Sequence, residues 1–390
     1  MAAALGIGRF VYTPILPVML TALGWSKSDA GIVASANFIG YLIGAMLASL
    51  PFAAARPRWW LVAALVTSSI ATAAMALSSN IVFFVALRFI GGAASAFVIV
   101  CASTLVLEQL ALSGRHSLSG VHFAGVGLGI MLSALAVSTM LLWNAGWTHL
   151  WIGAGVLAAS ATVMAAILIP HSRDIAARPQ VAKAQTSPPG IGAMILAYGL
   201  FGFGYVITAT FLIAIVRLAA NVNVLEPWVW IIFGLAAIPS VSVWGWLGQR
   251  IGIFNAFALA CALEALGVAA SVEWVTVPGI AVATLLLGGT FMGITALGFV
   301  AGRTLAAGNS QQALGRMTAS FSLGQIAGPV VAGFLSERLG DFRLASLIAA
   351  AALVGAAALS ARTSWLVAAH AVRQKTAAST DGCYLTANGA

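Results

Sequence analysis

Two arginines lie inside long apolar stretches of the sequence, where a charged side chain is costly. Arg9 and Arg88 have no Asp or Glu within the same stretch. A guanidinium at membrane depth normally faces a protein-lined or water-filled interior, and its planar fork matches carboxylates and phosphates. Tyr12 and Thr13 follow Arg9 by three and four residues, on the same face of a helix. The pattern indicates capture of an anionic group. The structural alternative is an arginine bonded to backbone carbonyls, which we favour for Arg88 but not for Arg9.

Polar and aromatic residues share faces on three other apolar stretches. These faces carry Asn37, Tyr41 and Gly44; Tyr198, Phe201, Tyr205 and Thr208; and Ser322 and Gln325. Hydrogen bonding between helices explains such faces as well as solute binding does. The candidate substrate-binding residues are therefore Arg9, Tyr12, Thr13, Asn37, Tyr41, Arg88, Tyr205, Thr208 and Gln325.

Two titratable residues are candidates for proton coupling. Glu264 lies well inside an apolar stretch, and His122 lies near the end of another. A carboxylate at membrane depth can carry a proton, and a histidine titrates near neutral pH. The alternatives are a locally paired carboxylate and a histidine at a helix interface. The sequence has no metal-binding cluster, Walker lysine or GxSxG motif, so we expect no cofactor, no metal site and no enzyme activity.

The composition indicates that membrane-spanning helices position these candidate residues. Of the 390 residues, 61% are hydrophobic and 7% are charged, against about 25% charged in a typical soluble domain. So few polar residues could not cover a soluble fold. Apolar stretches of about 20 residues recur instead, which excludes a soluble enzyme, a disordered protein and a secreted disulfide scaffold. We predict an all-α membrane protein with spans at 2–22, 29–52, 59–78, 81–106, 119–141, 148–169, 191–216, 227–247, 253–272, 278–301, 315–336 and 343–361.

Charge predicts how these spans lie in the membrane. Loops on the side of the membrane that holds the N-terminus carry about three times as many lysines and arginines as loops on the opposite side. Because such residues are enriched in cytoplasmic loops, this places both termini in the cytoplasm. The net charge of +9 therefore indicates topology and not nucleic-acid binding. The twelve tryptophans fall near span ends, as in an aromatic belt. We expect an N-terminal six-helix bundle at 1–169, a cytoplasmic linker at 170–190, a C-terminal six-helix bundle at 191–361 and a cytoplasmic tail at 362–390.

The two halves match at an offset of 196–197 residues. Gly6-Ile7-Gly8-Arg9 aligns with Gly202-Phe203-Gly204-Tyr205, Gly91-Gly92 with Gly288-Gly289, and Gly127 with Gly324. Parallel duplication of a six-helix unit, with a solute site between the halves, is a known transporter architecture.

Several motifs resemble those of the major facilitator superfamily. They are Leu87-Arg88-Phe89-Ile90-Gly91-Gly92, which is similar to its Arg-x-x-x-Gly signature, the Gly-rich run Gly125-Val126-Gly127-Leu128-Gly129, and Gly324-Gln325-Ile326-Ala327-Gly328-Pro329 in the second half. The opening segment 6–17 is similar to the first helix of the YbfB/YjiJ-like branch. Two features depart from the family: the loop at 53–58 has no Asp, and only eight residues precede Arg9. The short segment before Arg9 predicts either that the true start lies further upstream or that the first helix is short.

The resemblance implies two pseudo-symmetric six-helix bundles and a secondary active transporter that works by alternating access. Without an ATPase motif, we expect an ion gradient, most directly of protons, to drive it. The excess of interior cations predicts an anionic or zwitterionic metabolite, and the resemblance favours efflux. The alternatives are a broad-specificity drug or sugar efflux carrier and a non-transporting membrane receptor or assembly protein. The expected partners are a small-molecule substrate, the lipid bilayer and protons, for a monomer in the bacterial inner membrane.

Overall fold

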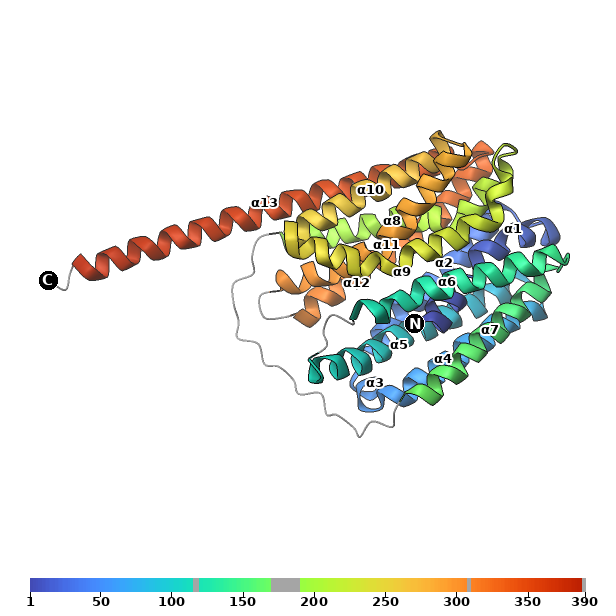
Figure 1. Ribbon diagram of the computed structural model, residues 1–390, viewed down its shortest axis with the longest axis horizontal. Helices are drawn as coiled ribbons and strands as arrows, with labels where there is room; N and C mark the ends of the chain where they lie inside the picture. The colour runs from blue at the N-terminus through green and yellow to red at the C-terminus, as the bar shows by residue number, and fades with distance from the viewer. Residues whose placement is uncertain (115–118, 170–189, 307–309, 388–390) are drawn as a thin grey trace.

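The computed structural model describes residues 1–114, 119–169, 190–306 and 310–387. Throughout these ranges the regular secondary structure is helical (Figure 1). Residues 170–189 of the expected linker lie outside the described ranges. In chain order the helices are η1 Ala2–Arg9, α1 Tyr12–Leu23, α2 Lys27–Ala48, α3 Pro51–Ala55, α4 Pro57–Ala74, η2 Met75–Leu77, α5 Ile81–Leu112, α6 Ser119–Leu142, α7 Trp147–Leu168, α8 Ile191–Leu218, η4 Asn223–Leu225, α9 Glu226–Ile251, α10 Ile253–Glu273, α11 Val277–Thr304, α12 Ser310–Leu339 and α13 Arg343–Ala387.

Among the described residues, twelve helical stretches are long and apolar enough to cross a membrane, and they correspond to the twelve predicted spans. Several ends differ from the prediction by four residues or more, and two of them differ for clear reasons. The second span was predicted to reach residue 52, but α2 ends at Ala48 and Pro51 starts α3. Proline forces the preceding residue into extended backbone, which ends the helix. The last helix, α13, continues through the predicted tail to Ala387, where no proline interrupts it.

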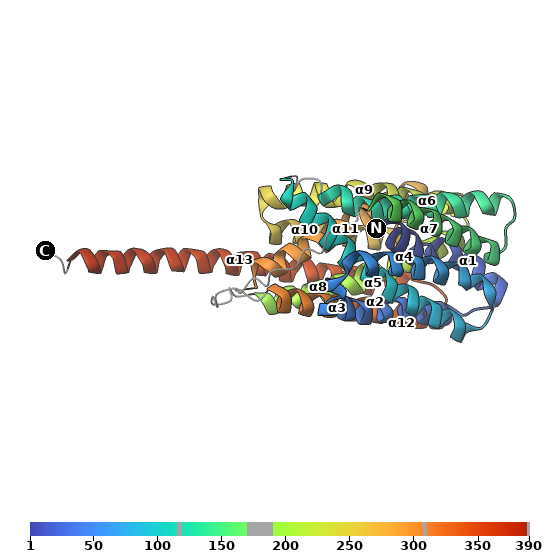
Figure 2. The same cartoon turned by 90° about the horizontal axis from the view of Figure 1, so that it is seen from below.

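The helices lie side by side along the long axis of the molecule, and the C-terminal part of α13 projects beyond the bundle (Figures 1 and 2). Successive long helices run in opposite directions, so their connections alternate between two ends. We name these ends after the predicted orientation. The outer end carries the connections at 24–26, 78–80, 143–146, 219–222, 274–276 and 340–342, and the inner end carries the described connections at 49–56 and 252.

The helix packing repeats between the two halves of the chain. In the first half α2 packs on α5 and α4 on α7, and in the second half α9 packs on α11 and α10 on α13. Glycines bring the first helix of each half close to its neighbour. A Cβ on Gly6 would lie 2.6 Å from the Gly129 Cα, and one on Gly324 would lie 2.2 Å from the Gly199 carbonyl oxygen. Helices α2 and α12, α6 and α9, and α1 and α8 join the halves. This arrangement confirms the predicted pair of six-helix bundles.

The aromatic-belt interpretation is wrong for three of the tryptophans. Trp151, Trp230 and Trp244 are buried, whereas Trp143 and Trp365 are strongly exposed. The Trp151 indole donates a hydrogen bond to the Met19 sulfur at 3.3 Å, and the Trp244 indole donates to the carbonyl of Gly289 at 2.8 Å. The Trp151 and Trp244 indoles thus have partners within the bundle, whereas the Trp230 Nε1 is buried without one.

Candidate functional site

A break in the first membrane-spanning stretch positions Arg9. The π-helix η1 ends at Arg9, and the α-helix α1 begins at Tyr12 after a two-residue turn. The Thr13 N–H bonds back to the Phe10 carbonyl at 3.2 Å, and Pro14 has no N–H to donate. The carbonyl of Arg9 therefore receives no bond from either residue. Such π-to-α transitions recur at functional sites because they free backbone groups.

Arg88 occupies the carbonyls that this break frees. Its Nη1 donates to the Gly8 carbonyl at 3.2 Å and its Nη2 to the Arg9 carbonyl at 3.1 Å. The guanidinium lies 4.9 Å from the centre of the Tyr12 ring, and the residue is buried. This is the contact expected of a structural arginine. It holds η1 in register with α5.

Arg9 itself is a buried cation without a carboxylate partner. Its guanidinium lies 4.5 Å from the Tyr41 ring centre, 4.8 Å from that of Phe38 and 5.5 Å from that of Phe10. The Tyr41 hydroxyl lies close enough to accept a hydrogen bond from the guanidinium. Its Nε and Nη2 atoms are buried and have no hydrogen-bond partner. Both ion pairs found among the described residues involve other arginines, so Arg9 keeps donors that an anion could use.

The second half presents a polar pair beside this cation. The Gln325 amide donates a hydrogen bond to the Tyr205 hydroxyl, and the rings of Phe291 and Phe321 stack on Tyr205 with centroids 6.0 and 5.9 Å away. Phe10 contacts Phe291 edge-on at 5.9 Å, which joins the two halves next to Arg9. Arg9 and Tyr205 are close enough to interact electrostatically.

Two unpaired polar atoms complete this side of the boundary. The Gln325 Oε1 and Thr208 Oγ1 atoms have no hydrogen-bond partner, and both residues are fully buried. Buried polar groups normally have partners, so such atoms are candidates for contact with a solute.

Three other candidate residues use their polar groups on the backbone. The Tyr12 hydroxyl donates to the Ala30 carbonyl at 2.9 Å. The Asn37 amide donates to the Arg88 carbonyl at 3.0 Å, which leaves its Oδ1 unpartnered. The Thr13 hydroxyl donates to the Ala209 carbonyl at 2.8 Å and so bridges the two halves. The structure thus brings Arg9 and Tyr41 together at the boundary with Tyr205 and Gln325, while these three residues join helices.

Glu264 lies in the second half, on α10. It is fully buried, and neither carboxylate oxygen has a hydrogen-bond partner. Thr290 of α11 lies beside it, but the Thr290 hydroxyl donates to the Leu286 carbonyl at 2.7 Å. An ionised carboxylate in such surroundings is very costly, so the group fits a neutral, protonated acid.

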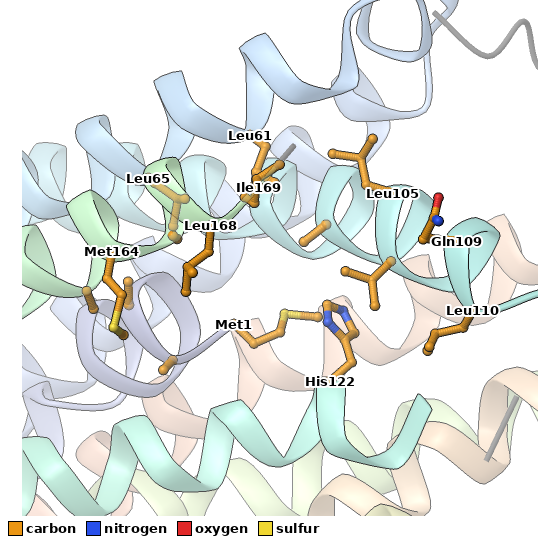
Figure 3. Close-up of a pocket in the computed structure, with 16 residues that line it drawn as sticks. Met1, Leu61, Leu65, Leu105, Gln109, Leu110, His122, Met164, Leu168 and Ile169 are labelled. Carbon is orange, nitrogen blue, oxygen red and sulfur yellow. The ribbon is translucent and has the colours of Figure 1, made fainter. Parts of the chain in front are cut away.

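His122 lies elsewhere, at a cavity of about 820 Å³ in the first half. Its Nε2 is 3.4 Å from the Ser103 hydroxyl, and Figure 3 shows its ring facing the side chain of Met1. The walls come from η1, α4, α5, α6 and α7 and are mostly apolar. The 196-residue offset maps Met1 onto Ala197, which six residues of α8 precede.

Sequence reasoning missed the aromatic residues around the candidate site. Phe10 and Phe38 contact Arg9, and Phe291 and Phe321 contact Tyr205. A local signal existed for two of them, because Phe10 adjoins Arg9 and Phe38 lies one turn before Tyr41. For the other two, only the packing of α11 and α12 reveals the contact.

In the part of the chain that the structure describes, no cluster of three His, Cys, Asp or Glu side chains could hold a metal ion.

Comparison with known proteins gives a family and a fold. Residues 1–361 match the profile of the family described as "Uncharacterised MFS-type transporter YbfB". Crystal structures of the nucleoside transporter NupG share the fold. A variant of NupG has 14% sequence identity and a TM-score of 0.69, and another NupG structure has 17% identity and a TM-score of 0.63. Each alignment covers 94% of this chain and 98% of the other.

Proposed function

The chain belongs to the YbfB family of major facilitator transporters, and on that premise we propose that it is a secondary active carrier of a small anionic or zwitterionic metabolite. The bundles at 1–169 and 191–361 alternate the access of a site at their boundary between the two sides of the membrane. Transport is driven by protons and directed outward, across the bacterial inner membrane, with both termini in the cytoplasm. The carrier acts as a monomer.

The unpartnered donors of Arg9 carry the substrate proposal. A guanidinium buried in the membrane without a counter-ion is unfavourable unless an anion joins it. The carboxylate or phosphate of a solute would accept hydrogen bonds from Nε and Nη2, which are free for it. The Tyr41 and Phe38 rings hold the guanidinium plane, and Arg88 holds the backbone that carries it. In this proposal Arg9 is the anchor and Arg88 is a positioning residue.

The second half supplies the other face of the site. Tyr205, Thr208 and Gln325 come from α8 and α12, so a solute that touches them and Arg9 bridges both bundles. Closure of the bundles around such a solute would be favoured by contacts on both sides. Carriers of this architecture bind solutes between their halves.

Glu264 is our candidate for proton coupling. Its burial without a partner favours the neutral acid in this conformation. A conformation that admits water to the carboxylate would favour release of the proton. A proton taken up on one side would then be released on the other. His122 is the second candidate and would act from the cavity at η1 instead.

A thermal-shift screen tests the substrate class. Purified protein is heated with organic acids, amino acids, nucleosides, sugars and cationic drugs, because a ligand that binds the folded state raises the melting temperature. The Arg9→Gln variant removes the anchor. The matched control is Arg250→Gln, since Arg250 lies exposed over Trp246, 4.4 Å from its ring centre. We expect at least one carboxylate to stabilise the wild type and the control but not Arg9→Gln. Equal stabilisation of all three proteins contradicts the proposal.

One observation favours a drug efflux carrier as the second candidate. The rings of Phe10, Phe291, Phe321 and Tyr205 form a connected aromatic cluster at the boundary of the halves. Such a cluster would also suit a flat hydrophobic compound. In the same screen, stabilisation by aromatic cations that is unaffected by Arg9→Gln would favour this function. Solute flux in proteoliposomes separates both carriers from a non-transporting receptor.

A further inference from the structure

The outer ends of α2 and α12 meet, and each helix has a charged side chain that binds the backbone at the end of the other. Lys27 is the first residue of α2. Its Nζ donates hydrogen bonds to the Ser336 carbonyl at 3.1 Å and to the Gly340 carbonyl at 2.7 Å. These carbonyls belong to the last turn of α12 and to Gly340, a glycine in the left-handed conformation that follows it. The Ser336 carbonyl also accepts the Gly340 N–H at 3.0 Å. Because the C-terminal end of a helix carries partial negative charge, a lysine ammonium stabilises it.

The return contact runs in the opposite direction. The Glu337 Oε2, in the last turn of α12, accepts a hydrogen bond from the backbone N–H of Ser28 at 3.2 Å. Ser28 lies in the first turn of α2, where N–H groups have no partner within the helix and attract negative charge. Each of the two helices thus provides a terminal cap for the other, although they belong to different halves of the chain.

The backbones of the two helices approach closely below these caps. A Cβ on Gly333 would lie 2.4 Å from the Lys27 carbonyl oxygen, and one on Gly31 would lie 2.3 Å from that of Pro329. The Ser35 hydroxyl donates across the same interface at 2.8 Å, to a carbonyl of α12. Any movement that separates the halves at the outer end breaks all these contacts together.

We propose that this reciprocal capping of α2 and α12 is a latch that holds the outer end of the carrier closed. Both described ion pairs, Arg217–Glu226 and Arg343–Glu273, lie within the second half and need not break when the halves separate. The latch contacts instead join the first half to the second. The proposal rests on alternating access, but it does not depend on which solute Arg9 binds.

Distances between spin labels at the outer end test the latch without any substrate. Cysteines are placed at Ser79 and Val224, exposed positions in different halves, with Cys101, Cys261 and Cys383 replaced by alanine. Double electron–electron resonance then measures the populations of short and long distances. The wild type is expected to show mainly the short, closed distance. Lys27→Met and Glu337→Gln are each expected to raise the ratio of open to closed molecules about threefold, because these charged contacts are exposed to solvent, which weakens them.

Glu273→Gln is the matched control, because it removes an outer-end carboxylate whose partner, Arg343, lies in the same half. It is expected to leave the distances unchanged. Gly333→Leu is an independent variant that wedges α2 from α12 without altering a charge, and it is expected to favour the open form as well. Melting curves check that each variant is folded. The latch is refuted if the wild type is mainly open, or if Lys27→Met and Glu337→Gln shift the distances no more than Glu273→Gln does.

Discussion

Replacing Arg88 by methionine is expected to destabilise the first half of the fold. The change removes two hydrogen bonds from a cation and leaves the Gly8 and Arg9 carbonyls buried without these donors. An unsatisfied buried group costs about 1–3 kcal/mol, so we expect a loss of about 3 kcal/mol for the pair. That corresponds to a fall in melting temperature of at least about 5 °C for a bundle of this size. Thermal unfolding of the detergent-purified protein measures it.

Two further variants make this prediction specific. Arg88→Lys keeps one charged donor, so it is expected to recover about half of the loss, because lysine cannot reach both carbonyls with a planar fork. Arg9→Met removes a buried cation whose Nε and Nη2 have no partners, and it is expected to leave the melting temperature unchanged or to raise it. An Arg88→Met protein that melts like the wild type would refute the structural role of Arg88.

Two more predictions concern helix packing and coupling. Gly40→Ala is expected to lower the yield of folded protein strongly, because its Cβ would lie 1.9 Å from the Phe89 carbonyl oxygen, whereas Gly289→Ala meets nothing within 4 Å and is expected to be neutral or slightly stabilising. Size-exclusion profiles of both variants test this, and equal profiles would contradict it. Glu264→Gln, an uncharged mimic of the protonated acid, is expected to keep ligand binding but to abolish acceleration of flux by a pH gradient. Unchanged acceleration would exclude Glu264 as the coupling group.

The sequence predicted the fold well because hydropathy is summed over about 20 residues in each span. All twelve spans and the repeat of two six-helix halves follow from that sum and from the glycine matches. The roles of the two membrane arginines could not be separated in this way. The carbonyls that Arg88 binds become free only through the π-helical turn before Tyr12, and no local pattern indicates that turn.

Contacts between residues far apart in the chain also could not be predicted from the sequence. The sequence shows Lys27 only as one of the basic residues between two predicted spans, yet it caps the end of α12. Trp230 was assigned to the membrane interface, but packing against Phe233 buries it. Helix types and spans are encoded locally, whereas the partner of a polar group depends on which helices become neighbours.

Carboxylate flux through reconstituted protein tests the central claim most directly. Proteoliposomes that contain the wild type, Arg9→Gln or Arg9→Lys are supplied with a panel of radiolabelled carboxylates under an imposed pH gradient. We expect the wild type to accumulate at least one carboxylate and Arg9→Gln to retain less than about a tenth of that flux. Arg9→Lys is expected to keep an intermediate rate, because it preserves the charge. Equal flux through wild type and Arg9→Gln, or no carboxylate flux through the wild type, would contradict it.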